Sequence, residues 1–171
     1  MRTALLFLLI PVAYSVAQSQ PAAPNRYILR EVSHEPAKLP HLAIFDDLSF
    51  RVEGYNVILL GQVTKPIVKS AAEKLVKRVE GVGQVIDQIE VLPLSPMTTK
   101  IRQATHLALV RQPPLESYFE QAWCPIRIIV KDGNVTLKGL VSNQADADLA
   151  RLSARNVPGA FSFTSKLEVA K

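Results

Sequence analysis

The residue types that most often carry catalysis or bind metals are few in this chain of 171 residues. The histidines His34, His41 and His106 could ligate a metal, but none stands in an H-x-x-x-H or H-E-x-x-H spacing, which would place two ligands on one helix face. The single cysteine, Cys124, can neither close an intramolecular disulfide nor complete a thiolate-rich zinc site. We therefore predict no metal, no cofactor and no enzymatic activity.

The adjacent acids Asp46 and Asp47 are a further candidate for acid–base chemistry. Neighbouring side chains on a short segment diverge, so we interpret this pair as capping or solvated residues. The chain contains no G-x-S-x-G elbow and no Gly-rich phosphate loop behind a strand pattern. A content of 48% hydrophobic residues argues against disorder, and the length argues against a multidomain enzyme.

A net charge of +5 is compatible with a nucleic-acid partner. The basic residues are spread along the chain, however, and do not form one run with interleaved aromatic residues. We predict no nucleic-acid binding.

The N-terminus has the pattern of an export signal. Arg2 supplies a charged region, residues 4–12 are apolar, and Ser15-Val16-Ala17 offers small residues for cleavage. The apolar run is too short to cross about 30 Å of hydrocarbon, which takes about 20 helical residues. We predict a signal peptide over residues 1–17, cleaved after Ala17, and a periplasmic or secreted protein, with residues 18–25 as a flexible linker.

The elements that would position any functional residue occur twice. Residues 50–92 align without a gap on residues 128–170, an offset of 78, and the identities concentrate at strand and glycine positions. Each copy begins with a helix, at residues 25–35 and 99–110, followed by a hairpin, at residues 50–63 and 127–141. A second helix (residues 65–79 and 143–157) and a third strand (residues 85–91 and 163–169) complete each copy. The glycines that mark turns, bulges and helix ends are Gly61, Gly81, Gly133, Gly139 and Gly159.

This order predicts an α+β protein with two tandem α-β-β-α-β units. Each unit is a small three-stranded mixed sheet that helices cover on one face. We place the first domain at residues 26–92, a linker with Pro93 and Pro96 at residues 93–98, and the second domain at residues 99–171.

The second copy carries a pattern that resembles a known family. It runs V-K-D-G-N-V-T-L-K-G-L-V over residues 130–141, V-P-G-A over residues 157–160 and L-E-V over residues 167–169. This is similar to the BON domain, the bacterial OsmY and nodulation module. The first copy matches more loosely, since Gly54-Tyr55 replaces the Asp-Gly turn. The resemblance implies export to the bacterial envelope, with roles in phospholipid or membrane association and in osmotic or envelope stress protection.

The two copies differ on the sheet face that points away from the helices. In the second strand of the first copy this face carries Ile58 and Leu60, where the second copy has Thr136 and Lys138. Apolar residues there must be covered by another part of the chain or form an exposed patch. Both possibilities remain open, and Ile58 and Leu60 are candidate contacts for a protein partner.

The long helices also differ in charge. Residues 65–79 contain one acidic residue, Glu73, and five basic residues, whereas charges balance in residues 143–157. A basic face is attracted to anionic headgroups, by about 1 kcal/mol for each Lys or Arg near the surface. The candidate lipid-binding residues are Lys65, Lys69, Lys74, Lys77 and Arg78.

A cluster of aromatic residues, Tyr118, Phe119 and Trp123, precedes the second hairpin beside Cys124. Aromatic residues in such a place fill the edge of a core, and we also weigh an interfacial anchor, with Trp123 as a partner contact. Cys124 is interpreted as a small buried hydrophobic residue.

Taken together, these patterns predict a non-enzymatic envelope protein that binds anionic phospholipid or membrane surfaces. The alternative is a protein–protein adapter of the periplasm, which docks an envelope protein through the apolar outer face of the first copy. The first predicts salt-sensitive binding, and the second predicts binding with little salt effect.

Overall fold

A computed structural model describes residues 24–34, 39, 41–120 and 124–170 of the chain. The predicted signal peptide and Trp123 lie outside the described residues.

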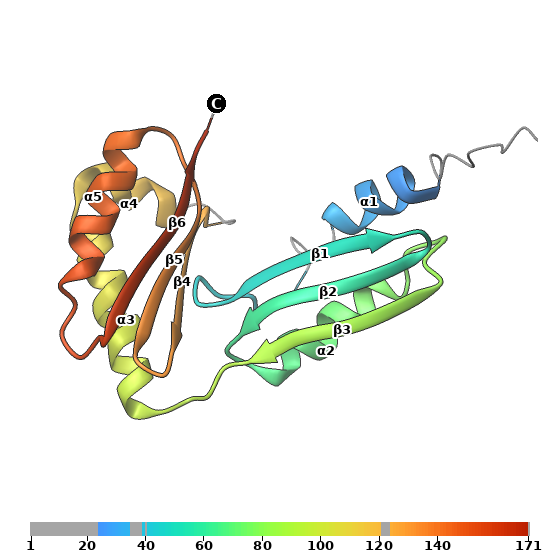
Figure 1. The fold of residues 1–171 in the computed structure, drawn as a ribbon, viewed down its shortest axis with the longest axis horizontal. Helices are drawn as coiled ribbons and strands as arrows, with labels where there is room; N and C mark the ends of the chain where they lie inside the picture. Colours follow the sequence, from blue (N-terminus) through green and yellow to red (C-terminus); the bar gives the residue numbers. More distant parts are fainter. Residues whose placement is uncertain (1–23, 35–38, 40, 121–123, 171) are drawn as a thin grey trace, which may run out of the picture.

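The first half of the chain forms a three-stranded sheet in the order β1-β2-β3 (Figure 1). Strand β2 pairs antiparallel with β1 and parallel with β3. The elements are α1 (Pro24–His34), β1 (Asp47–Glu53), β2 (Asn56–Val63), α2 (Pro66–Val76) and β3 (Gln84–Val91).

The second half repeats this arrangement in the order β4-β5-β6, with the same antiparallel and parallel pairings. Its elements are α3 (Pro96–Val110), α4 (Pro113–Glu120), β4 (Ile126–Lys131), β5 (Asn134–Val141), α5 (Gln144–Arg155) and β6 (Ser162–Val169). The predicted fold class, two repeated α+β units with mixed sheets, is therefore confirmed. Helix α4 was not predicted from the sequence.

Alternation along the strands decides which residues enter the two cores. Val57, Leu59 and Val63 of β2 are buried in the first core, as the repeat predicts. Val135 and Leu137 of β5 are buried in the second core. Burial of each such side chain contributes about 1.5–3 kcal/mol, so the helix-facing side of each sheet supplies much of the stability.

A glycine at the same place in both copies allows two strands to approach closely. Gly139 has φ +127°, and a Cβ atom there would lie 1.8 Å from the carbonyl oxygen of Pro125. Gly61 has φ +117°, and its Cβ would lie 2.1 Å from the carbonyl oxygen of Asp47. Any side chain at these positions would force the hairpin apart, which explains the identity between the copies.

Local signals set the turns and helix ends. Asp132 and Gly133, with φ +49° and +77°, form the predicted tight turn of the second hairpin. Helix α3 begins at Pro96, three residues before its predicted start, because Ser95 caps it by accepting a hydrogen bond from the backbone N–H of Thr98. Helix α2 ends at Val76 rather than at Val79.

The two halves contact each other through the segment before β1. The backbone N–H of Ile128 in β4 donates to the carbonyl oxygen of Ile44 at 2.9 Å, and Phe45 packs against the second core. Ion pairs join Lys138 to Asp47 and Lys131 to Glu90 at 2.6 Å. The first half thus protects the open edge of β4 with its own backbone.

Candidate functional site

Helix α2 presents one face to the first sheet and the opposite face to solvent. Val68, Ala72 and Val76 are buried against the sheet. Ile67 and Lys74 lie one above the other on the outer side and are exposed, with 58% of the surface of Ile67 accessible. Lys77 and Arg78 follow the end of the helix and are also exposed. We call this surface the basic face, defined by Ile67, Lys74, Lys77 and Arg78.

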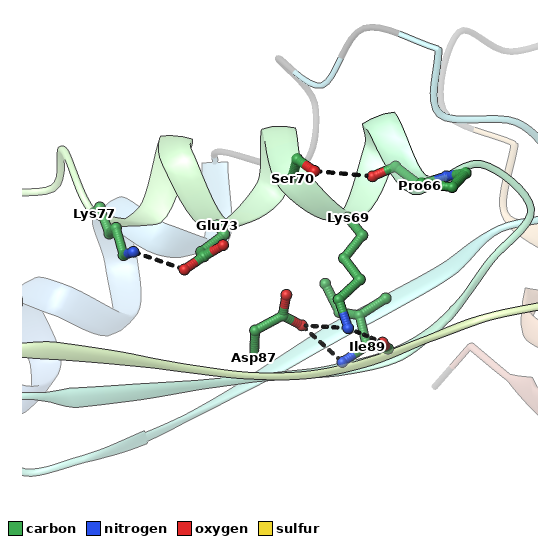
Figure 2. A network of polar contacts seen from close by, with 7 residues as sticks. All are labelled: Pro66, Lys69, Ser70, Glu73, Lys77, Asp87 and Ile89. Carbon is green, nitrogen blue, oxygen red and sulfur yellow. Dashed lines mark hydrogen bonds and ion pairs between the residues drawn. The ribbon is translucent and has the colours of Figure 1, made fainter.

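Lys69, one of the predicted lipid-binding residues, does not lie on the basic face. Its Nζ donates a hydrogen bond of 2.6 Å to the carbonyl oxygen of Ile89 in β3 and lies 3.5 Å from the carboxylate of Asp87 (Figure 2). Its position one turn from buried residues directs the side chain down to the sheet edge rather than outward.

Lys77 lies on the basic face, but it forms an ion pair with an acidic residue. Its Nζ lies 2.6 Å from Glu73, one helical turn away (Figure 2). The hydrogen bond from Lys77, together with its charge, lowers the pKa of Glu73. Glu73 is therefore ionised at neutral pH and offsets part of the positive charge of this face.

Lys74 and Arg78 are exposed, and neither forms an ion pair with a residue that the structure describes. Lys65 is also exposed but occupies the N-cap of α2. At 1.5 Å per residue it lies about 14 Å along the axis from Lys74. The charge therefore gathers at the C-terminal end of the helix, where it also complements the helix dipole.

The equivalent helix of the second half lacks this face. At the offset of 78, α5 has Leu152 in place of Lys74 and Asn156 in place of Arg78. Arg151 pairs with Asp148. The difference in charge between the two copies is therefore present on the surfaces of α2 and α5.

For Ile58 and Leu60, proposed as protein contacts, the sequence left open whether the side chains are covered or exposed. Ile58 is only 4% exposed and Leu60 is half-buried, although neither belongs to the core beneath the helices. The covered alternative therefore holds for Ile58, whereas Leu60 keeps part of its surface accessible. Trp123, the third candidate, lies outside the described residues.

The other aromatic residues of the cluster fill the second core, as predicted. Tyr118 is 6% exposed, and its hydroxyl donates to Asp146 at 2.6 Å and accepts from the backbone N–H of Ser142 at 2.8 Å. Phe119 packs against the core. Cys124 is half-buried, and its thiol donates to the carbonyl oxygen of Phe119 at 3.6 Å.

The residues considered for catalysis have structural surroundings. His106 is half-buried between the rings of Phe45 and Phe119, and burial lowers its pKa. Asp46 is buried and accepts hydrogen bonds from the backbone N–H groups of Ala43 and Thr64, so it ties two loop segments together rather than capping a helix. Within the described part of the chain no group of His, Cys, Asp and Glu side chains could hold a metal ion.

None of the helices in the described ranges is both long enough and apolar enough to span a membrane.

Comparison with known proteins gives a family match and two structural likenesses. The family model described as BON domain matches residues 37–93 and 122–171. No curated protein matches the chain. A solved structure of the C-terminal domain of CdsD, the structural protein of the type III secretion system of Chlamydia trachomatis, is similar at a TM-score of 0.32 and 16% identity, over 83% of this chain and 64% of that chain. A second CdsD structure has a TM-score of 0.29 and 14% identity, over 84% of this chain and 93% of that chain.

Proposed function

Because the chain belongs to the BON domain family, we propose that it is a non-enzymatic protein of the bacterial envelope that associates with anionic phospholipid surfaces. The export signal predicted over residues 1–17 supports delivery to the periplasm or the exterior. Protection against osmotic or envelope stress is the cellular role that this placement suggests.

The observation that carries the proposal is the basic face of α2. Lys74 and Arg78 are exposed without ion pairs among the described residues, and the exposed Ile67 lies on the same side of the helix. Two or three cations at about 1 kcal/mol each give about 2–3 kcal/mol of attraction, or roughly two decades in affinity. Such binding is weak and depends on salt, because the Debye length falls from about 30 Å at 0.01 M to about 8 Å at 0.15 M.

Vesicle sedimentation of the processed chain tests this proposal. We expect binding to vesicles that contain phosphatidylglycerol, no binding to pure phosphatidylcholine, and release as salt rises through about 0.15 M. The double variant Lys74→Glu/Arg78→Glu, which removes two cations and adds two anions, should abolish binding.

The matched control is the double variant Arg151→Glu/Arg155→Glu, which makes the same change in net charge on α5. It should retain most of the binding. An equal loss in both variants would mean that net charge rather than the basic face attracts the vesicle, and binding to phosphatidylcholine would refute a role for the headgroup charge.

A further inference from the structure

The outer edges of β3 and β6 differ in a way that bears on binding. The backbone N–H of Leu92 donates to the carbonyl oxygen of Val63, and that of Ala170 donates to the carbonyl oxygen of Val141. The even-numbered residues of β3 and β6 therefore direct their backbone N–H and C=O groups to β2 and β5. Because backbone direction alternates along a strand, odd-numbered residues direct their N–H and C=O groups to the open edge. On β6 these residues are Phe163, Ser165, Leu167 and Val169.

The edge of β3 is blocked by side chains. The N–H of Ile89 donates to the Asp87 carboxylate at 2.9 Å, and its carbonyl oxygen accepts from Lys69 Nζ at 2.6 Å (Figure 2). The two side chains also pair with each other. An added strand would have to displace two charge-assisted hydrogen bonds, one at the N–H and one at the C=O of Ile89. Strand β3 is therefore protected against pairing.

The edge of β6 lacks this protection. At the offset of 78, Ala147 stands in place of Lys69, Ser165 in place of Asp87 and Leu167 in place of Ile89. The Oγ atom of Ser165 is buried and has no hydrogen-bond partner among the described residues. No side chain in the described part of the chain bonds to the outward backbone groups around Leu167, which leaves these groups for another strand.

A groove accompanies this edge, and we call it the β6 groove. It has a volume of about 590 Å³ and lies between α5 and β6, lined by Asp148, Arg151, Leu152, Arg155, Phe163 and Ser165. This volume is in the range of ligand sites, about 300–1,000 Å³. Arg155 is exposed and forms no ion pair with a described residue, so the groove carries uncompensated positive charge next to the apolar Leu152 and Phe163.

We propose that the β6 groove binds an extended, acidic segment of a partner protein by strand addition. The backbone of the segment pairs with the odd-numbered residues of β6, and its carboxylates face Arg151 and Arg155. This surface is separate from the basic face of α2, so the inference does not depend on phospholipid binding.

An extended segment fits this place better than a second folded copy. Paired strands lie about 4.8 Å apart, whereas packed helices need about 8–10 Å between their axes. Helix α5 lines the same groove as β6. If the β6 strands of two copies paired about a twofold axis, their two α5 helices would therefore have to share the space beside the paired strands. A single extended chain brings no helix.

Amide hydrogen exchange, measured by NMR on the processed chain, tests the proposal. The probe is the peptide acetyl-Gly-Glu-Val-Glu-Val-Glu-Val-Gly-amide at about 1 mM, a concentration that detects weak complexes. We expect it to slow exchange at Phe163, Ser165, Leu167 and Val169, without a change at Lys166, whose N–H already faces β5. The same peptide with Lys in place of Glu should not protect these amides.

Two substitutions make the test specific. Ser165→Pro removes one outward N–H at an edge position where proline is tolerated, and should weaken peptide binding about tenfold or more, whereas Ser165→Ala keeps the N–H and should bind as the parent does. Arg155→Glu, on the surface, should also weaken binding about tenfold without affecting the fold.

If the lysine peptide protected the amides of β6 equally, the proposal that the partner segment is acidic would be refuted. If the amides became protected without peptide as the protein concentration rose, the strand added to β6 would come from a second copy of the chain and not from a partner protein. Absence of protection at the odd-numbered amides would overturn strand addition itself. Vesicle binding is a separate outcome from peptide binding, since none of these substitutions touches α2.

Discussion

Replacement of Lys69 by methionine separates a structural role of this residue from a role at the membrane. The change keeps the length of the side chain and removes the hydrogen bond to Ile89 and the ion pair with Asp87. A hydrogen bond that involves a charged group contributes about 1.5–3 kcal/mol, and a partly exposed ion pair adds about 0.2–1 kcal/mol. Because methionine recovers some apolar contact with the sheet, we expect a net loss of about 2 kcal/mol in the free energy of unfolding.

Urea denaturation, followed by circular dichroism, measures this loss. The matched control is Lys74→Met on the outer side of the same helix, which should change stability by less than about 0.5 kcal/mol. Vesicle binding should show the reverse order, since Lys74→Met weakens it and Lys69→Met leaves it unchanged in the folded protein. If both variants lowered stability equally, or if Lys69→Met released the protein from vesicles, the assignment of Lys69 to the sheet edge would be refuted.

Two further predictions concern stability. Gly139→Ala should cost about 3 kcal/mol or more, because its Cβ would lie 1.8 Å from the carbonyl oxygen of Pro125, whereas Gly54→Ala, at φ +61° with no atom within 4 Å, should cost about 1 kcal/mol in the same denaturation assay. A comparable cost for the two would contradict the close-approach argument. Burial lowers the pKa of His106 in the folded state, so the unfolded chain takes up a proton first as pH falls through about 6.5, and stability should decline below that pH. In His106→Gln the urea midpoint should change less between pH 7.5 and 5; an unchanged pH dependence would show that His106 is not its source.

Much of the fold follows from local sequence patterns. Alternating apolar residues in β2 and β5 predict the strands and the side that faces the helices, because side chains of successive residues point to opposite faces. The repeat adds the order of the elements, and the BON pattern in the second copy identifies the family. The eight-residue helix α4 escaped prediction, since a short segment that opens with Pro113 and Pro114 carries too few turns for periodicity to show.

The placement of the predicted lipid-binding residues follows from the sequence only in part. Counting charges between residues 65 and 79 singles out α2 as the basic helix, but treats all five cations alike. Their roles differ because Lys69 lies toward β3 and Lys77 lies beside Glu73, whereas Lys74 and Arg78 point outward. Helical spacing could have separated Lys74 from Lys69, but the partner in β3 follows only from the pairing of distant segments.

The sequence by itself determined the family, the two repeated units and the asymmetry of charge between them, since these depend on residue order and local periodicity. The tertiary structure decided that Ile58 is covered, that Lys69 and Asp87 block the edge of β3, and that no described side chain blocks the same edge of β6. These outcomes depend on which segments, far apart in the chain, become neighbours. An exposed backbone edge is a property of strand pairing, and the physical reason for its availability at β6 is the absence of the two side chains that occupy it at β3.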